Sequence, residues 1–516
     1  MKSIYKTVFG LPPSVILLVT LTLLAVTLSL SKSQAQQTNG DAIFSSNQIH
    51  TIYLQFSQTS WFDSLLATHA GDYYMSVNGI FDGDTLNNIG IKTKGNSSFN
   101  NPNNKKSLKI DFDIYDSTLA WDGLTKINLN NGFKDPTFLR EKIALDFANT
   151  HGVYAPRCTY ANVYLNNQLW GLYMLVEEVD NKFLKDRFGN KNGNLFKGDP
   201  NGTLNYMGAS ATPYYSAYEL HTNEIANDWS DLILLCNTLN NSPAATLQSS
   251  LDTVIDLQEW YRAWACNILF ANMDSYQGSG HNYFIYHNTT TDKFEWISWD
   301  VNESFGVFLN GLTTAQLKAL PPDYIPSGQN RPLETRPLDD ADMKCDYYQA
   351  VYNLLMTGFD SSFFNPMIDS LSDWIRPSVY ADPHKFFTNQ DFEINLTTDI
   401  GNTPGLKNFI PERVNAVLPL LLASGCNLSG VNNELTNDNG QLTVYPNPCS
   451  EWLVVSGSWL GNTIEVKDVL GRTVLSSIIR YPSPILLDVN DLQAGIYFLS
   501  VKTADGKMMS RKIVIQ

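Results

Sequence analysis

Residues 265–307 have the sequence ACNILFANMDSYQGSGHNYFIYHNTTTDKFEWISWDVNESFGV, and they contain two aspartates at the ends of apolar segments. Asp274 follows a helix-like run and enters a loop of Ser, Gln and Gly, while Asp300 follows a short strand-like run. Carboxylates on loops at the ends of buried elements are well placed to reach a ligand. Together with Asn282 they are the groups that metal-assisted phosphoryl transfer needs, since one acid orients the attacking hydroxyl while a carboxylate and an amide hold a divalent ion.

The spacing alone favours a structural role, because an aspartate at a strand end is more often a turn former or a helix cap. A second stretch adds context: IGIKTKGNSSFNNPNNKKSLKIDFDIY, residues 89–115. One strand is predicted to run into Gly95-Asn96-Ser97-Ser98, and another to cover residues 106–112. Such a turn can fold over an anion, with lysines on the flanking strands neutralising it. The alternative is an ordinary hairpin with solvated lysines.

The composition indicates a globular chain. With 516 residues, 43% of them hydrophobic and 17% charged, we expect about three domains with well-buried cores. The formal net charge is −16, and the acidic excess lies in the middle of the chain. We therefore expect no nucleic-acid partner, because such binding requires clustered Lys and Arg.

The N-terminus has the order of a secretory signal peptide: Lys2 and Lys6, then an apolar run over 15–30, then small residues up to Ala35. We predict a signal peptide over residues 1–35, the alternative being a retained membrane anchor. No second run of spanning length follows, so no stable transmembrane helix is expected after cleavage. The six cysteines show no zinc-binding spacing, and export permits disulfides whose pairing the spacing does not reveal.

Between these ends, period-two patterns predict a strand-rich front over residues 49–198, with hairpin signals at Asn78-Gly79 and Asn166-Asn167. After residue 218 the period changes to about 3.6, which predicts a helix-rich back over residues 219–425. A cleft between two such lobes would suit a small ligand. The proline-rich segment 320–337 is predicted to be an irregular loop near that cleft.

In this order, the stretches resemble the spore-coat protein H (CotH) kinase family, secreted or surface proteins with an atypical protein-kinase-like fold. The resemblance spans roughly residues 45–425. It is carried by KGNSS (94–98), KKSLKIDF (105–112), FLREKIALDFAN (138–149), VYLNNQLWGLYMLVEEVDNKFL (163–184), NLFKG (194–198), NMDSYQGSGHNYFIY (272–286) and WISWDVNESFG (296–306).

The resemblance implies a role for each position. Asp274 would be the catalytic aspartate, while Asp300 and Asn282 would hold Mg²⁺ or Mn²⁺. ATP would lie under the turn of residues 95–98, and Glu177 and Glu178 would lead into the hinge where adenine is held. The phosphates would be contacted by one lysine of Lys105, Lys106 and Lys109, a choice that strand parity leaves open. The implied nucleotide-binding set is Lys94, Gly95, Asn96, Ser97, Ser98, Lys106, Lys109 and Glu177.

Two departures from the family pattern bear on activity. Lys94 stands where members often carry Arg before the Gly-Asn-Ser turn, which loses a bidentate phosphate contact. Asn302 stands where a second acid commonly follows the Trp-Asp motif. A degenerate kinase acting as a ligand- or partner-binding scaffold is therefore kept beside the kinase interpretation. A third hypothesis makes Asp274 and Asp300 a glycosidase pair.

The last 76 residues, after a polar linker over 427–440, contain LTVYPNP, VKDVLGRTVL and LDVNDLQAGIYFLSV, a pattern of about seven short strands. They resemble the type A C-terminal sorting domain of the type IX secretion system, the alternative being a carbohydrate-binding sandwich. The resemblance implies export to the surface or medium through that machinery. The predicted fold is α+β: a bilobal kinase-like domain over 36–426, then a small all-β immunoglobulin-like sandwich over 441–516. The acceptor protein stays unnamed.

Overall fold

A computed structural model describes residues 38–46, 48–428 and, nearer the C-terminus, 443–445, 449, 452–456, 463–468, 471–478, 485–502 and 508–515. The predicted signal peptide, residues 1–35, and all but the first two residues of the predicted linker lie outside these ranges.

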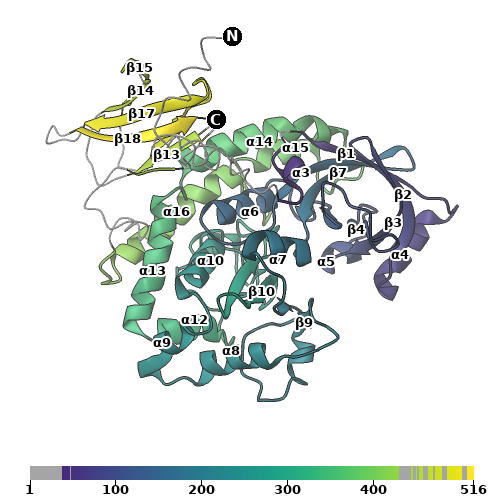
Figure 1. Cartoon of the computed structure of the whole chain (residues 1–516), viewed down its shortest axis with the longest axis horizontal. Helices are drawn as coiled ribbons and strands as arrows, with labels where there is room; N and C mark the ends of the chain where they lie inside the picture. The colour runs from purple at the N-terminus through teal and green to yellow at the C-terminus, as the bar shows by residue number, and fades with distance from the viewer. Residues whose placement is uncertain are drawn as a thin grey trace, which may run out of the picture.

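The front of the chain forms a closed barrel with the strand order β1-β2-β3-β4-β5-β7-β6 (Figure 1). β1 pairs with β6 in parallel, and the other neighbours are antiparallel. The strands are β1 (His50–Gln55), β2 (Met75–Phe81), β3 (Asp84–Lys94), β4 (Ser107–Asp111), β5 (Lys126–Asn130), β6 (Cys158–Leu165) and β7 (Gln168–Glu177). The mixed α/β content agrees with the predicted class, but the front is a barrel, which strand periodicity alone did not predict.

Alternation along the strands determines what the barrel encloses. β2 is buried at every second residue, and the inward residues of β3, β4 and β5 join one apolar core. β7 is buried on both faces, because Tyr173 and Leu175 pack inside the barrel while Met174 and Val176 pack against the rest of the chain. The outer face of β3, β4 and β5 therefore carries their polar residues beside the second part of the molecule.

The hairpin predictions had different outcomes. Asn166 and Asn167 form the turn between β6 and β7 with φ of 48° and 64°, as predicted. The prediction at Asn78-Gly79 is wrong, because β2 continues through both residues with a register shift between Val77 and Gly79. The chain turns at Asp82 and Gly83, where the Asp-Gly-Asp sequence also predicts a turn, and their φ values of 51° and 105° are left-handed.

Behind the barrel, a second sheet has the order β11-β10-β8-β9. Its strands are β8 (Leu195–Gly198), β9 (Tyr218–Leu220), β10 (Tyr283–Asn288) and β11 (Lys293–Ser298). The accompanying helices are α6 (Arg140–Thr150), α7 (Asn181–Phe188), α8 (Ser230–Asn241), α9 (Leu247–Leu251), α10 (Leu257–Leu269), α11 (Thr314–Lys318), α12 (Pro332–Leu338), α13 (Ala341–Met356), α14 (Ser361–Ala381), α15 (Asn389–Asn395) and α16 (Leu406–Leu422). The helix-rich back is thus confirmed.

The expectation that segment 320–337 has no regular structure is wrong, because α12 begins at Pro332. Proline at the first position of a helix costs nothing, since that residue has no N–H partner inside the helix. The preceding residue, Arg331, is fully buried and donates from Nε to the carbonyl of Tyr276 at 2.6 Å and from Nη2 to that of Gly278 at 2.8 Å. The segment therefore supports the loop that follows Asp274.

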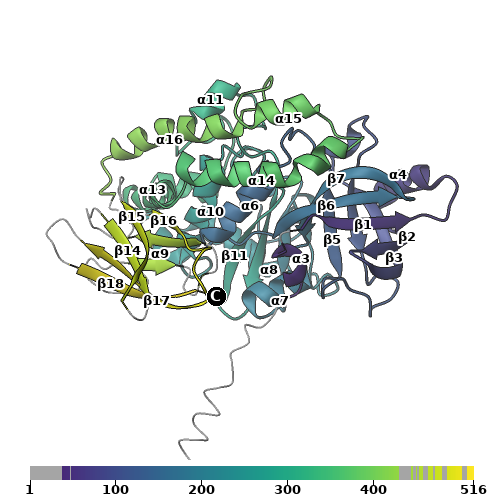
Figure 2. The same ribbon diagram turned by 90° about the horizontal axis from the view of Figure 1, so that it is seen from above.

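A buried ion pair joins the barrel to α14, which runs across to β7 in Figure 2. Lys105 Nζ lies 2.6 Å from Asp382 Oδ2, with both side chains fully buried, and the same oxygen accepts from the Leu172 backbone N–H at 3.0 Å. A Cβ at Gly171, whose φ is 147°, would lie 2.5 Å from the Asp382 carboxylate. This packing fixes the barrel against the end of α14 and removes Lys105 from the candidate phosphate contacts.

A disulfide between Cys345 in α13 and Cys426 closes the predicted kinase-like region. Beyond it, the described strands form a three-stranded sheet, β12-β13-β16, and a four-stranded sheet, β15-β14-β17-β18. They are β12 (Thr443–Tyr445), β13 (Trp452–Ser456), β14 (Thr463–Asp468), β15 (Thr473–Ile478), β16 (Ile485–Asp488), β17 (Gly495–Lys502) and β18 (Met508–Ile515). Over the described parts of the chain, no helix has both the length and the apolar character needed to span a membrane.

Candidate active site

Asp274 lies in the loop after α10 and is held by three side-chain donors. Its Oδ1 accepts from Ser279 Oγ at 3.1 Å and lies 2.8 Å from His281 Nε2. The amide of Asn282 donates to Oδ2 at 3.1 Å and to the Asp274 carbonyl oxygen at 2.8 Å. The Asp274 side chain remains 16% exposed, so the carboxylate is fixed while one side stays accessible.

Asp300 follows β11 with a left-handed φ of 51°. Burial raises the pKa of its carboxyl group, the charge of Lys94 opposes that rise, and the negative charge of Asp274 adds to it. These mutual influences mean that Asp300 lies close to both side chains. The structure therefore brings together the two acids from the back and a lysine from the barrel, which are separated by some 180 residues in the sequence.

Lys94 is the residue through which the barrel reaches this cluster. Its Nζ extends across β4 and donates to Asn128 Oδ1 at 3.0 Å and to Asn130 Oδ1 at 3.2 Å, and it lies 5.2 Å from the ring centroid of Trp299. Burial lowers the pKa of the ammonium group, and the charge of Asp300 is the largest opposing influence. The ammonium group of Lys94 thus contacts the amide oxygens of Asn128 and Asn130 and lies near the carboxylate of Asp300.

Glu141, in the first turn of α6, is a third acid at this place that the sequence patterns did not indicate. It is 1% exposed, and both of its oxygens accept from Asn130 Nδ2, at 2.8 and 3.0 Å. Burial raises the pKa of Glu141 to about 7, and the negative charge of Asp300 contributes to that rise. Glu141 therefore adds a third carboxyl group beside Asp300 and Lys94.

Lys109 and Glu178 form an ion pair on the outer face of the barrel, with Nζ 2.9 Å from Oε2. Asn128 Nδ2 also donates to this oxygen at 2.9 Å. Burial acts to raise the pKa of Glu178. The charge and hydrogen bond of Lys109 outweigh this effect and lower that pKa to about 2. The charges of Glu178 and Lys109 also act on Lys94, so this pair borders the same cluster.

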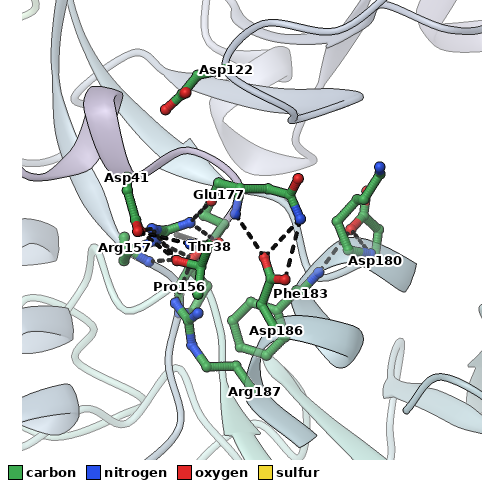
Figure 3. A network of polar contacts seen from close by, with 12 residues as sticks. Thr38, Asp41, Asp122, Pro156, Arg157, Glu177, Asp180, Phe183, Asp186 and Arg187 are labelled. Atoms are coloured by element: carbon green, nitrogen blue, oxygen red, sulfur yellow. Dashed lines mark hydrogen bonds and ion pairs between the residues drawn. The ribbon is translucent and has the colours of Figure 1, made fainter. Parts of the chain in front are cut away.

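Glu177, the sequence-predicted nucleotide contact, belongs to a different network, with Arg157 and Arg187 (Figure 3). Its carboxylate lies 2.6 Å from Arg157 Nη2 and 3.0 Å from Arg187 Nη2, and it is 1% exposed. Consecutive residues at the end of a strand point to opposite faces, so only one of the two glutamates can face the cluster around Lys94 and Asp300. The contacts identify Glu178 as that residue, which corrects the sequence-based choice of Glu177.

The predicted phosphate-covering turn follows β3. Gly95 has φ of 93°, Asn96 precedes the short helix α5 (Ser97–Asn100), and a Cβ at Gly95 would lie 2.2 Å from Ser98 Oγ. Lys106 does not extend toward Lys94, because its Nζ donates to the carbonyls of Phe99, at 2.7 Å, and Asn101. Lys106 therefore holds the turn, whereas Lys109 is the lysine of this group that borders the cluster of Lys94 and Asp300.

Glu303 is a further acid near the two aspartates, three residues after Asp300. Its oxygens lie 2.9 and 2.8 Å from Lys134 Nζ, and burial raises the pKa of Glu303 to about 7 despite that partner, with Asp274 and Asp300 adding to the rise. The expected second acid at position 302 is thus replaced by an acid one residue further on, neutralised by a lysine from the loop after β5. In the sequence, the signal for this acid was the glutamate three residues after the aspartate of the Trp-Asp motif, in WDVNE.

The oxygen atoms of Asp300 and Asn282 are the ligands that a divalent ion on a nucleotide could use. Within the described ranges no group of three His, Cys, Asp or Glu side chains is arranged to hold a metal. Mg²⁺ on a nucleotide needs only one or two carboxylates, since phosphate oxygens and water complete its shell. Asp300 supplies a carboxylate, and because Asn282 uses Nδ2 for Asp274, its Oδ1 remains available as a second oxygen. These residues fit such an ion.

Comparison with known families gives the class of the protein. Residues 91–417 match the profile of the CotH kinase proteins, which covers more than half of the chain, so the chain belongs to this family. Residues 443–516 match the secretion system C-terminal sorting domain. This domain indicates export and a secreted or cell-surface location, and it implies interaction with the secretion machinery.

Individual relatives are found in bacteria and fungi. Inner spore coat protein H of Bacillus subtilis (strain 168) is 29% identical over 287 residues, which cover 54% of this chain and 75% of the relative. Invasin CotH3 of Rhizopus delemar is 23% identical over 269 residues, 48% of this chain, and the chain spans only 43% of that protein. Helicobacter pylori proinflammatory kinase CtkA covers 66% of this chain with 95% of its own, at 9% identity and a TM-score of 0.29, too low to infer a shared fold.

Proposed function

We propose that this protein is a secreted or cell-surface atypical protein kinase of the CotH type, which transfers the γ-phosphoryl group of ATP to Ser or Thr of a partner protein. Residues 36–426 would form the kinase-like domain, with the barrel and the helix-rich back as its two lobes. The observation that carries the proposal is the cluster of Lys94 from the barrel with Asp274 and Asp300 from the back, whose charges act on one another.

In the proposed reaction, the acceptor hydroxyl oxygen forms a bond to the γ-phosphorus while the bond from that phosphorus to the β,γ-bridging oxygen breaks, so ADP leaves. The hydroxyl proton passes to the carboxylate of Asp274. Because Asp274 is held by Ser279, His281 and Asn282, it is oriented before the substrate arrives. Catalysis would come from placement and electrostatics, with little covalent work by the protein.

On the phosphate side, the ammonium groups of Lys94 and Lys109 would offset negative charge, and the turn of residues 95–98 would cover the triphosphate. Lys106 would keep that turn in shape through its two carbonyl contacts. Glu178 would orient Lys109, as their 2.9 Å contact supports. Lys94 and Lys109 would thus contact the nucleotide, whereas Lys106 and Glu178 would hold the contacting groups in place.

Asp300, with Oδ1 of Asn282, would hold Mg²⁺ or Mn²⁺. A divalent ion there supplies charge neutralisation for the phosphates. The burial of Asp300 beside Asp274, Glu141 and Glu303 supports this assignment, because the acids repel one another without an added cation. The carboxylate of Asp300 would then orient the nucleotide through the ion, and Lys94 would meet it from the barrel.

The test incubates the mature protein with labelled ATP and a protein fraction that contains candidate acceptors. Three conditions are compared: Mg²⁺, Mn²⁺ and a chelator. Wild type should transfer label only with metal, and Asp274→Asn and Asp300→Asn should each reduce the rate at least about 100-fold. Asp292→Asn is the matched control, because this aspartate lies in the turn between β10 and β11 with a 93% exposed side chain. Transfer that persists in both site variants would refute the assignment, and nucleotide binding without transfer would instead favour a scaffold.

We further propose that the signal peptide is cleaved after Ala35 and that residues 441–516, folded as an immunoglobulin-like sandwich, are recognised by the type IX secretion machinery. The match of residues 443–516 to the sorting domain supports this route. Removal of residues 441–516 should leave the protein in the periplasm, as fractionation would detect. Appearance of the truncated protein outside the cell would refute the route.

A further inference from the structure

In the loop after α10, three side chains contact the proposed catalytic carboxylate of Asp274. We propose that His281 is a positioning residue that fixes the Asp274 carboxylate so that Oδ2 alone is open to the acceptor hydroxyl. This inference rests on the proposed function, since it specifies how that function uses Asp274.

The hydrogen bonds leave one acceptor position on Asp274. A carboxylate offers about four lone-pair sites. Oδ1 uses two, one for Ser279 Oγ at 3.1 Å and one for His281 Nε2 at 2.8 Å, while Oδ2 uses one for Asn282 Nδ2 at 3.1 Å. The remaining lone pair is on Oδ2, so the proton of an acceptor hydroxyl has a single destination.

Among the three donors, His281 has the most specific relation to the carboxylate. Asn282 also binds the Asp274 carbonyl oxygen at 2.8 Å, so it maintains the main chain of the loop. Ser279 also donates to the Ser275 carbonyl at 3.4 Å. Within the described part of the chain, the His281 side chain hydrogen-bonds the carboxylate alone. Its role is therefore to set the rotation of that group.

The backbone of the loop brings His281 to this position. Gly280 has a left-handed φ of 77° and donates its N–H to the Ser275 carbonyl at 3.0 Å, which turns the chain back toward Asp274. A Cβ at Gly278 would lie 1.9 Å from the Met273 carbonyl oxygen. Arg331 holds two carbonyls of the same loop. His281, which lies just before β10, is thereby held beside the carboxylate. The contact is thus built into the loop.

The experiment compares His281→Ala with His281→Gln in the mature protein, using the labelled-ATP assay with Mg²⁺ or Mn²⁺. Gln places an amide nitrogen where Nε2 of His lies, so it keeps the donor. His281→Ala should lower kcat about 10- to 100-fold with KM for ATP within about twofold of wild type. His281→Gln should restore kcat to within about threefold of wild type.

The matched control is His287→Ala, because His287 lies on β10, six residues after His281, and also pairs with an aspartate, with Nδ1 3.1 Å from Asp231 Oδ2. Its kcat should stay within about twofold of wild type. Thermal unfolding of each variant separates loss of the fold from loss of position, and Ser279→Ala serves as a second variant should His281→Ala not fold, with an expected loss in kcat of about threefold or more.

The outcomes distinguish this inference from the proposed function. If wild type is active and kcat is unchanged in His281→Ala, the inference is overturned while the proposed function stands. The same holds for an unchanged kcat in Ser279→Ala, if His281→Ala does not fold. A His281→Gln variant as slow as His281→Ala would also overturn it, because retention of the donor would then have no effect. A wild type that transfers no phosphoryl group under any metal condition would overturn the proposed function and this inference with it.

Discussion

Glu177 and Glu178 are neighbours at the end of β7, yet they belong to different regions of the molecule. Glu177 joins an outer network with Arg157 and Arg187, which also reaches the N-terminal residues Asn39 and Asp41 (Figure 3). Glu178 joins the inner cluster with Lys109. Both oxygens of the outer carboxylate are paired with guanidinium groups, whereas the inner carboxylate is paired with one lysine. The outer contacts join elements of the fold, and we propose that the inner cluster binds a charged ligand.

Breaking the outer network should have the largest effect on stability. Glu177→Gln leaves Arg187 without its carboxylate partner and Arg157 with that of Asp41 alone. Loss of one partner of a buried pair costs about 3 to 5 kcal/mol. Urea unfolding should show this loss, while the metal-dependent affinity for ATP measured on the folded variant should stay within about twofold of wild type. A tenfold loss of affinity at unchanged stability would reverse the assignment of the two glutamates.

The inner acids predict a pH dependence of stability. The pKa of folded Glu141 is about 7, above its ordinary value of 4.5, so the unfolded chain loses this proton first as pH rises. The free energy of unfolding therefore falls between about pH 4.5 and 7. In Glu141→Gln this contribution is absent, so the variant should gain about 2 to 3 kcal/mol over wild type between pH 5 and 8. Denaturant unfolding at several pH values tests this; a constant difference would contradict it.

A smaller effect sharpens the role of Glu178. In Glu178→Gln, Lys109 loses the carboxylate that holds it at 2.9 Å, so its ammonium group is no longer fixed toward the cleft. Affinity for ATP with Mg²⁺ should fall about tenfold, which equals about 1.4 kcal/mol. Titration calorimetry measures it, with Glu177→Gln as the control from the other side of the strand. Unchanged affinity would remove Lys109 from the nucleotide site.

The smallest effect is expected at the edge of the outer network. Asn39 donates from Nδ2 to both oxygens of Asp186, at 3.2 and 3.0 Å, and its backbone N–H donates to the same carboxylate at 3.1 Å. Asn39→Ala keeps the backbone contact and loses the side-chain ones, which should cost about 1 kcal/mol. The change should appear in thermal unfolding, with transfer activity within about twofold of wild type. A loss of activity would show that the outer network controls the site.

Local patterns predicted the elements well because their causes are local. The Asn166-Asn167 turn has left-handed residues, and Asp180 caps α7 by accepting from the N–H groups of Lys182 and Phe183. These interactions lie within a few residues, so the sequence contains them. The strand-rich front and helix-rich back followed in the same way from the hydrophobic period.

The site was predicted in part. Asp274, Asn282, Asp300 and Lys94 were indicated by position and resemblance, but Glu141 was not. Between Glu177 and Glu178 the nucleotide-binding set took Glu177, because the partners that distinguish the two glutamates come from other parts of the chain. Which face of β4 and β7 meets the back depends on barrel closure, which no local pattern records. The pairing of Cys345 with Cys426 likewise depends on the contact between α13 and the end of α16.

That disulfide has a mechanical consequence. Cys426 is the last half-cystine before the segment that leads to the sorting domain, and its partner lies in α13, which packs against α10. A pull on the C-terminal end, whether from a transporter or from an anchored tail, would pass through the covalent bond into the centre of the helical region. The force would then bypass α16. The loop that carries Asp274 follows α10, and it would be protected from unfolding that starts at the C-terminal end.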